Sequence, residues 1–235
     1  MKAVVPAAGE GTRLGGLTAD RPKGLVKIAG KPLLTHVFEA LQQCSLEEIV
    51  VIIGHRGAQI TDHYGTSFRG TPLRYVTQDE QLGLAHALLQ AEPFVETDFV
   101  SLNGDNVLCA DLEALKTRHE ESGASATCFV ERVTRERAGI GGVFELADDR
   151  IVGLVEKPPE PPSRLVPRGC WMFSTHIFDA CRRVTPAHTG EYELSAAVDL
   201  LLAAGRQVEP VSLDGWCVNV NTPDDCAAVS KLCGE

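Results

Sequence analysis

A run of five apolar, β-branched residues at Ile49–Ile53 constrains this chain most, because it fits a strand that is buried on both faces of a sheet. Similar runs recur through the first half of the sequence, and amphipathic segments alternate with them. We expect strands at Ala3–Pro6, Ile49–Ile53, Leu73–Thr77 and Phe99–Leu102, and helices at Leu33–Gln43, Gly57–Tyr64 and Leu84–Ala91. This alternation with short links predicts an α/β fold, with a parallel sheet and helices on both of its faces.

Three polar or glycine-rich segments follow directly after predicted strands. They are Pro6–Arg13, Gln78–Gly83 and Asn103–Asn106. Ligands of open α/β sheets bind outside the carboxyl ends of the strands. We therefore expect these three segments to lie together at one edge of the sheet, where they would form a binding site.

The second half of the chain is less regular. Five prolines within Lys157–Pro167 predict an irregular surface loop, and Asp148-Asp149-Arg150 predicts the turn of a hairpin. No linker or repeat divides the chain, so we expect a single domain over residues 1–235. The further predicted helices are Leu112–Ser122 and Ser195–Ala204, and the further strands are Ala126–Arg132, Gly142–Leu146, Ile151–Glu156, Trp171–Phe173, Val208–Val211 and Trp216–Val220.

Composition narrows the class of partner. The formal net charge is −10, which disfavours nucleic acid and anionic membranes as partners because both reward a basic face. The eight cysteines show no zinc-ligand spacing, and we interpret them as buried thiols in a reducing cytoplasm. The sequence shows neither a signal peptide nor a membrane-spanning run. It leaves open whether the chain forms a homo-oligomer.

The segment Pro6-Ala7-Ala8-Gly9-Glu10-Gly11-Thr12-Arg13 has the composition of a phosphate-binding loop. Gly9 and Gly11 remove side chains that would keep a polyphosphate from the backbone N–H groups. Arg13 offers a fork for phosphate oxygens, and Lys23 offers a point charge. The next glycine, Gly15, is one position too late for a dinucleotide-binding fingerprint, and the lysine of a P-loop is absent.

Asp105 lies in Gly104-Asp105-Asn106, directly after a predicted strand, where its carboxylate would face the ligand edge. Mg²⁺ takes one or two oxygen ligands from a protein and the others from phosphates and water. Asp105 with one partner would therefore be enough for a magnesium site.

Together these motifs resemble the sugar-1-phosphate nucleotidylyltransferase family, which includes thymidylyl- and uridylyltransferases. The resemblance begins at Pro6–Arg13 with Arg21-Pro22-Lys23 and continues in the same order through most of the chain. Its later segments are Gly30–Leu34, Gln78…Gly83-Leu84-Ala85, Leu102–Asn106, Gly142-Val143, Val155–Pro158 and Trp216–Pro223.

The resemblance implies a Rossmann-like three-layer α/β/α fold with a mixed, mostly parallel sheet. Residues 1–110 would bind the nucleotide and residues 111–235 the sugar phosphate. It assigns metal binding to Asp105 and Asn219, sugar-phosphate binding to Gly142, Glu156, Lys157 and Glu193, and catalysis to Arg13, Lys23, Asp105 and Lys157. The nucleotide contacts that it implies are Pro6, Ala7, Ala8, Gly9, Gly11, Thr12, Arg13, Gln78, Gly83 and Leu84.

The implied reaction joins an NTP, UTP or dTTP, to a sugar 1-phosphate and releases pyrophosphate by in-line attack, assisted by Mg²⁺. Positioning and charge neutralisation would supply the catalysis. Two alternatives stay open at this point. One is a cytidylyltransferase that acts on an alcohol phosphate such as phosphocholine or inositol phosphate, and the other is a non-catalytic nucleotide-sensing subunit of the same fold.

Overall fold

The computed structural model describes residues 1–148 and 150–234. The strands are β1 (Lys2–Pro6), β2 (Lys27–Ile28), β3 (Lys31–Pro32), β4 (Glu48–Ile53), β5 (Ser67–Phe68), β6 (Thr71–Thr77), β7 (Phe99–Leu102), β8 (Asn106–Cys109), β9 (Ala126–Arg132), β10 (Gly142–Ala147), β11 (Arg150–Glu156), β12 (Leu165–Phe173), β13 (Val208–Ser212) and β14 (Trp216–Asn219). The α-helices are α1 (Leu33–Leu41), α2 (Gly57–Tyr64), α3 (Leu84–Leu89), α4 (Leu112–Ser122), α5 (Arg135–Ala138), α6 (His176–Arg183), α7 (Leu194–Ala203) and α8 (Pro223–Leu232), and short 3₁₀ helices cover Thr12–Thr18, Lys23–Leu25 and Glu92–Phe94.

One eight-stranded sheet, in the order β13-β9-β12-β7-β1-β4-β6-β5, takes strands from both halves of the chain. The pairs β1–β4, β1–β7, β4–β6 and β13–β9 are parallel. Strand β12 runs antiparallel to both of its neighbours, and β5 runs antiparallel to β6. The predicted mixed, mostly parallel sheet is confirmed.

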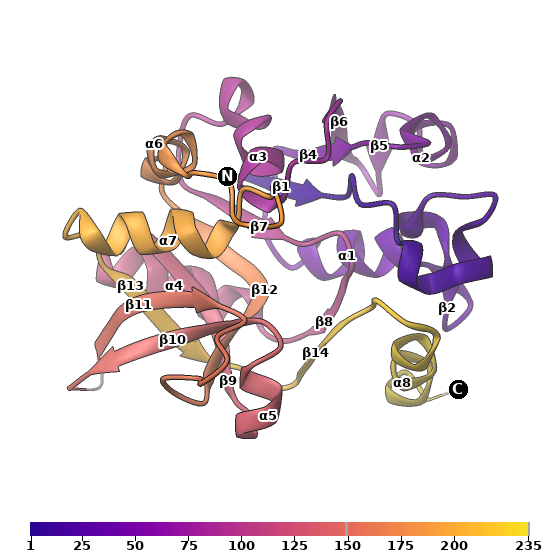
Figure 1. Ribbon diagram of the computed structural model, residues 1–235. Helices are drawn as coiled ribbons and strands as arrows, with labels where there is room; N and C mark the ends of the chain where they lie inside the picture. The colour runs from indigo at the N-terminus through magenta and orange to yellow at the C-terminus, as the bar shows by residue number, and fades with distance from the viewer. Residues whose placement is uncertain (149, 235) are drawn as a thin grey trace.

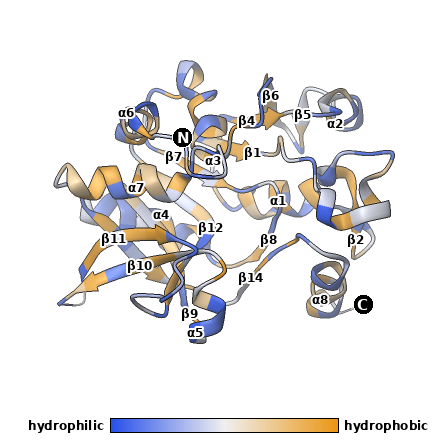
Figure 2. Cartoon of the chain, in the orientation of Figure 1, coloured by the Kyte–Doolittle hydropathy of each residue, from blue (hydrophilic) through white to orange (hydrophobic). Residues whose placement is uncertain are grey.

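Helices cover both faces of this sheet, which gives the predicted three layers (Figure 1). Helices α3, α6 and α7 pack with the β10–β11 hairpin on one face, around residues such as Phe99 and Trp171. Helices α1, α2 and α4 cover the other face, around Phe38 and Phe129. After the charged residues that begin them, Lys2 and Glu48, strands β1 and β4 are largely hydrophobic (Figure 2), in keeping with burial on both sides.

A smaller apolar cluster holds the C-terminal segment against the N-terminal one. Leu14, Val26, Val107, Val220 and Val229 are buried together there. They belong to the first 3₁₀ helix, the loop before β2, strand β8, the end of β14 and helix α8. This cluster brings Val220 and its neighbours beside the loop that follows β1, although more than half of the chain separates them in sequence.

The proline-rich segment departs from the prediction. Leu165–Pro167 belong to β12 and pair with β9, where we expected an irregular loop over Lys157–Pro167. The pairing register shifts between Pro167 and Trp171, so Pro167 lies at an irregularity, which is one of the few places where a sheet tolerates proline. Helices α6 and α8 and strand β8 were also not predicted.

The predicted hairpin is present as the antiparallel pair β10–β11, but Asp149 of its predicted turn lies outside the described residues. Among residues 1–148 and 150–234, no helix is long and apolar enough to cross a membrane.

Candidate active site

The strand order reverses between β1 and β7, and a cavity lies at this point. Strands β4 and β6 lie on one side of β1, whereas β7 and β12 lie on the other. Segments that follow two neighbouring parallel strands therefore diverge and leave a crevice at their carboxyl ends. The cavity there has a volume of about 200 Å³, and it is lined by Pro6, Ala7, Gly9, Gly11, Thr12, Arg13, Lys23, Gly24, Gly104, Asp105 and Asn221.

The loop after β1 folds around the side chain of Lys23. Gly11 has a φ of 69°, a left-handed conformation that favours glycine. A Cβ atom at Gly11 would lie only 2.9 Å from Cβ of Lys23. Lys23 is thereby packed under the loop, and only 8% of its surface is exposed.

Gly104 fixes Asp105 beside the same loop. The Gly104 N–H donates to the Pro6 carbonyl at 2.8 Å, and a Cβ atom at Gly104 would lie 2.7 Å from that oxygen. The segments after β1 and β7 can approach this closely only with glycine at position 104. The next residue, Asp105, therefore has a fixed place in the cavity.

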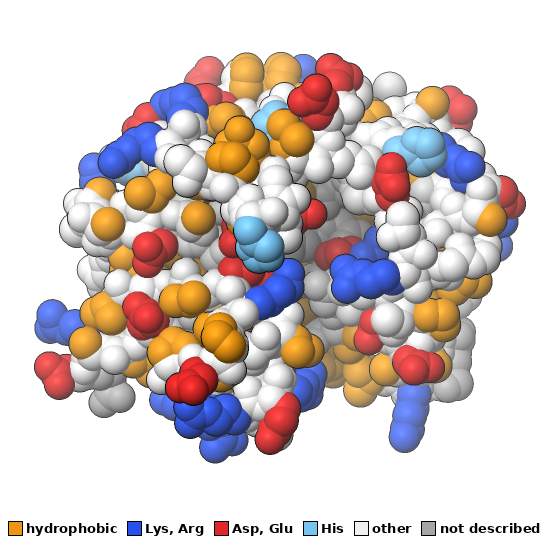
Figure 3. All heavy atoms as spheres, viewed as in Figure 1, with side chains coloured by type: hydrophobic (Ala, Val, Ile, Leu, Met, Phe, Trp, Pro, Cys, Tyr) orange, Lys and Arg blue, Asp and Glu red, His pale blue; other side chains and the backbone are white. Residues whose placement is uncertain are grey.

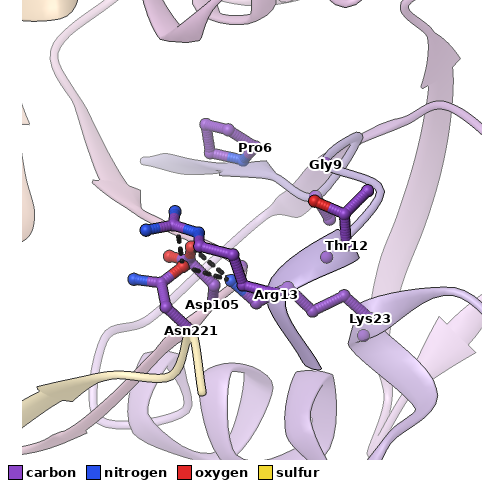
Figure 4. A pocket seen from close by; sticks show the side chains of 11 residues that line it. Pro6, Gly9, Thr12, Arg13, Lys23, Asp105 and Asn221 are labelled. Atoms are coloured by element: carbon purple, nitrogen blue, oxygen red, sulfur yellow. Dashed lines mark hydrogen bonds and ion pairs between the residues drawn. The ribbon is translucent and has the colours of Figure 1, made fainter. Parts of the chain in front are cut away.

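Four polar side chains from distant parts of the sequence meet in the cavity (Figure 4). Lys23 Nζ donates to Asp105 Oδ2 at 2.8 Å and to Asn221 Oδ1 at 3.0 Å. Arg13 donates to the same Asn221 oxygen at 3.2 Å. Two cations thus converge on a space that phosphate oxygens could fill, and one carboxylate keeps their charge partly balanced.

Asn221 was missed in the sequence analysis. Its backbone N–H donates to Asp225 Oδ2 at 2.9 Å, and Thr222 and Asp225 form a capping box at the start of α8. The pattern Asn219-Val220-Asn221 could have revealed it, because the buried Val220 separates two polar residues in extended chain. Asn219 ends β14 opposite Asn106 and is exposed, so its role as a metal ligand stays a prediction.

The other predicted nucleotide contacts extend along the same sheet edge. Gln78 follows β6, and its N–H donates to the Ile53 carbonyl at 2.8 Å. Gly83 and Leu84 form the start of α3. Ala8 is buried against Gly54, where a Cβ atom would lie 2.7 Å from the Ala8 carbonyl oxygen. These residues do not line the cavity itself, so any nucleotide contact through them must lie beyond it.

The predicted sugar-phosphate residues form a separate and more open group. Lys157 has a φ of 43°, its N–H donates to the Gly141 carbonyl, and its side chain is 64% exposed. Nζ of Lys157 lies 3.4 Å from Glu156 Oε1. A Cβ atom at Gly142 would lie 3.4 Å from Glu156 Oε2, so the carboxylate stands over the start of β10. Positive φ at a residue other than glycine marks strain of the kind found at functional sites.

Electrostatics distinguish Glu156 from an ordinary surface carboxylate. Burial raises its pKa above the usual range, Lys157 acts in the opposite direction, and the nearby Glu193 raises it further. Glu193 is the residue before α7, and its charge acts on that of Glu156. The two carboxylates could accept hydrogen bonds from hydroxyl groups of a ligand, and the lysine could pair with its phosphate.

A hollow is visible in the molecular surface (Figure 3), with Lys and Arg side chains at its rim and acidic side chains within it. The Asp105 carboxylate in the cavity is a ligand that suits a hard divalent ion, whereas the Asn221 amide oxygen already accepts from Lys23 and Arg13. Lys23 engages one oxygen of that carboxylate.

Comparisons with known proteins identify the family of this chain. The family model for nucleotidyl transferases matches residues 2–230, and the chain belongs to this family. One relative is the UTP–glucose-1-phosphate uridylyltransferase AglF of Haloferax volcanii, which is 44% identical over 226 residues, 96% of this chain and 93% of that protein. Another is a glucose-1-phosphate thymidylyltransferase of Streptomyces griseus, 34% identical over 99% of this chain but only 66% of its own length.

Solved structures show the same fold. A Bacillus anthracis protein crystallised with sucrose superposes with a TM-score of 0.90, at 25% identity, over 99% of this chain and 94% of its own. A UDP-glucose pyrophosphorylase in complex with UDP-glucose gives a TM-score of 0.88 at 22% identity, over 98% and 97% of the two chains. The predicted Rossmann-like fold is therefore confirmed at the level of whole chains.

Proposed function

We propose that this protein is a sugar-1-phosphate nucleotidylyltransferase that joins UTP to glucose 1-phosphate and releases pyrophosphate. The observation that carries the proposal is the convergence of Arg13, Lys23 and Asp105 in one cavity at the switch point of the sheet. The relative that is 44% identical over almost its whole length is a uridylyltransferase that uses glucose 1-phosphate. A thymidylyltransferase among the more distant relatives makes dTTP the second nucleotide to test.

In this proposal the loop after β1 holds the triphosphate. Backbone N–H groups around Gly9 and Gly11, together with Arg13, bind the β- and γ-phosphates that leave as pyrophosphate. Lys23 lies deeper and neutralises charge at the α-phosphate. The loop is held in place before substrate arrives, so little reorganisation is needed in the transition state.

Lys157, Glu156 and Glu193 would hold the sugar phosphate. The phosphate is already ionised near neutral pH and needs no covalent catalyst or general base. Lys157 would offset its repulsion from the NTP, and the carboxylates would accept hydrogen bonds from sugar hydroxyls. Attack on the α-phosphorus then depends on placing the two anions in line. Residues 1–110, joined by Asn221, would supply the nucleotide site, and other residues of 111–235 would supply the sugar site, within a single domain.

Asp105 would hold a magnesium ion, with Asn219 as a second oxygen ligand. When bound, the ion would neutralise phosphate charge that Arg13 and Lys23 leave uncompensated. We further infer a cytoplasmic location, where NTPs and sugar phosphates are available. All eight cysteines lie in the described part of the chain as free thiols, in keeping with a reducing compartment. The prediction that they are all buried is wrong for Cys109 and Cys233, which are exposed, and for Cys226, which is half-buried.

The test is a matrix of NTPs against sugar 1-phosphates and alcohol phosphates, with Mg²⁺, read as pyrophosphate release. We expect the fastest release with UTP and glucose 1-phosphate. Release only with CTP and an alcohol phosphate would replace the proposal by the cytidylyltransferase alternative. Nucleotide binding without release for any acceptor would indicate a nucleotide-sensing protein.

A further inference from the structure

Gln78 lies within reach of a nucleotide that is bound in the cavity. Its backbone continues the β4–β6 ladder by one residue, and β4 lies between β6 and β1. At the usual strand spacing, Gln78 is about 10 Å from the end of β1 along the sheet edge. A nucleoside whose triphosphate lies in the cavity could therefore place its base near Gln78, a polar residue that is only 4% exposed.

Two acceptors fix the orientation of the Gln78 amide. Its Nε2 atom lies 3.3 Å from the Gly83 carbonyl oxygen and 2.8 Å from His86 Nδ1. A carbonyl oxygen can only accept, so the nitrogen and not the oxygen of the amide must face it. Both amide hydrogens are then engaged. In the described part of the chain no donor contacts Gln78 Oε1, so this oxygen is left to accept from a ligand.

This orientation requires one tautomer of His86. Nδ1 can accept from Gln78 only if it carries no proton, so the ring proton must be on Nε2. Nε2 lies 3.3 Å from Gln90 Nε2, and that amide nitrogen also donates to the His86 carbonyl at 3.1 Å. A neutral imidazole accepts at one nitrogen only. A carbonyl oxygen fixes each amide nitrogen, that of Gly83 for Gln78 and that of His86 itself for Gln90. The contact of Nδ1 with Gln78, at 2.8 Å, is shorter than that of Nε2 with Gln90, at 3.3 Å, so we assign the acceptor to Nδ1.

The segment that carries both acceptors is held rigidly. Gly83 has a φ of 100°, and a Cβ atom there would lie 2.7 Å from the Tyr192 carbonyl oxygen. Tyr192 pairs with this segment on both sides, since its N–H donates to Leu82 at 2.7 Å and its carbonyl accepts from Ala85 at 2.9 Å. The loop before α7 therefore fixes the Gly83 carbonyl and the first turn of α3, on which His86 lies.

We propose that His86 is a positioning residue that holds the Gln78 amide with its oxygen toward the nucleobase, so that the site selects a base with a ring N–H. This inference rests on the proposed function. Uracil and thymine carry a hydrogen on N3, which can donate to Gln78 Oε1, whereas N3 of cytosine is a bare acceptor that the same oxygen repels. Cytosine could reach Oε1 only through its exocyclic amine, after a shift of the ring.

The first test compares His86→Leu with His86→Asn, by measuring kcat/KM for UTP and for CTP with the same sugar phosphate. His86→Leu removes the acceptor, and we expect the preference for UTP over CTP to fall about tenfold, the scale of one hydrogen bond. The asparagine Oδ1 can take the place of Nδ1, so His86→Asn should restore the preference to within about threefold. Gln90→Leu is the matched control and should leave the ratio unchanged.

A merely structural role for His86 predicts equal losses with both nucleotides. An unchanged ratio in His86→Leu, with measurable turnover of UTP, would overturn the proposal. Absence of pyrophosphate release by the wild-type protein with every NTP would contradict the proposed function, which is a different outcome from an unchanged ratio.

A second measurement does not depend on activity or on the stability of a variant. The nitrogen chemical shifts of the His86 ring in ¹⁵N-histidine-labelled wild-type protein report the tautomer. We expect Nδ1 to be unprotonated and Nε2 to carry the proton, with and without UTP. A proton on Nδ1 in the neutral ring would overturn the proposal, because the Gln78 amide nitrogen could then no longer donate to it.

Discussion

The two halves of the candidate active site differ in how far they are assembled before substrate arrives. On the nucleotide side, Lys23 is packed beneath its loop and joined to Asp105 and Asn221. On the sugar side, the Lys157 side chain is 64% exposed and pairs with Glu156. In the proposed function, the first arrangement would bind a flexible, highly charged triphosphate without having to organise its own cations. The second would leave room for a sugar to enter and complete the contacts.

Asp105→Ala should have the largest effect, because it removes the carboxylate on which the nucleotide side depends and leaves Lys23 buried without its ion-pair partner. We expect kcat to fall about 10³-fold or more, as for the loss of a strong transition-state contact. Pyrophosphate release with saturating UTP measures it. Asp111→Ala is the control: Asp111 caps α4, so this change should cost about 1 kcal/mol of stability and leave kcat unchanged. Equal activity in the two variants would show that Asp105 has no special role.

Arg13→Ala should come next, with kcat/KM for UTP lowered about 10²- to 10³-fold. Arg13 is more exposed than Lys23 and contacts Asn221 rather than the carboxylate, so Asp105 and Lys23 stay paired without it. Arg21 is a matched control on the same segment, because its side chain pairs with its neighbour Asp20 at the surface. Arg21→Ala should change kcat/KM less than about twofold, as expected for an exposed ion pair. A comparable loss in both variants would mean that the net charge of the segment matters and not the position of Arg13.

Lys157→Ala tests the sugar side. We expect KM for glucose 1-phosphate to rise about 10- to 100-fold, the scale of a hydrogen bond to a charged group, while KM for UTP stays within about twofold. Initial-rate kinetics with each substrate varied in turn separate the two constants. Lys116→Ala, which removes another surface lysine that pairs with a glutamate, is the control. A rise in KM for UTP instead would place Lys157 on the nucleotide side and remove the distinction between the two halves.

The placement of residues on the nucleotide side could be predicted from the sequence more closely than that on the sugar side, for a physical reason. Each of its segments follows a buried parallel strand, and Ile49–Ile53 and its neighbours are recognisable from their apolar, β-branched residues. Asn221 was missed because it follows β14, a strand outside the main sheet, and reaches the cavity only through the packing of α8 and the cluster around Val220. Helix α8 was missed too, although its capping residues Thr222 and Asp225 stand at the expected spacing.

The error at Leu165–Pro167 has a similar cause. Local composition argued for a loop, but tertiary pairing with β9 placed these residues in a strand, with an irregularity at Pro167. Such pairing depends on a partner more than thirty residues away, which local pattern does not show. The sugar side is built on this region of the sheet and on the β10–β11 hairpin, so its geometry could not be predicted as closely.

Glu156→Gln should have the smallest effect of these substitutions. It should raise the stability of the protein and weaken the binding of the sugar phosphate. Burial raises the pKa of Glu156, so keeping it ionised costs stability above that pKa, and the neutral amide should raise Tm by about 1–3 °C at pH 8. Because the folded pKa lies above the unfolded value, the cost is absent below the unfolded pKa, and the two melting curves should converge near pH 4. Glu113→Gln, an exposed carboxylate on α4, is the control for a lost surface charge.

The same variant should bind glucose 1-phosphate more weakly, because an amide accepts hydrogen bonds from hydroxyl groups less strongly than a carboxylate does. A Tm that rises equally at pH 4 and pH 8 would contradict the electrostatic cause. A gain in stability without a loss of sugar binding would show that the carboxylate at 156 does not contact the sugar. If both predictions hold, the ionised Glu156 carboxylate destabilises the free protein and is stabilised when the sugar binds. On the nucleotide side, by contrast, Lys23 and Asp105 already neutralise one another before substrate arrives.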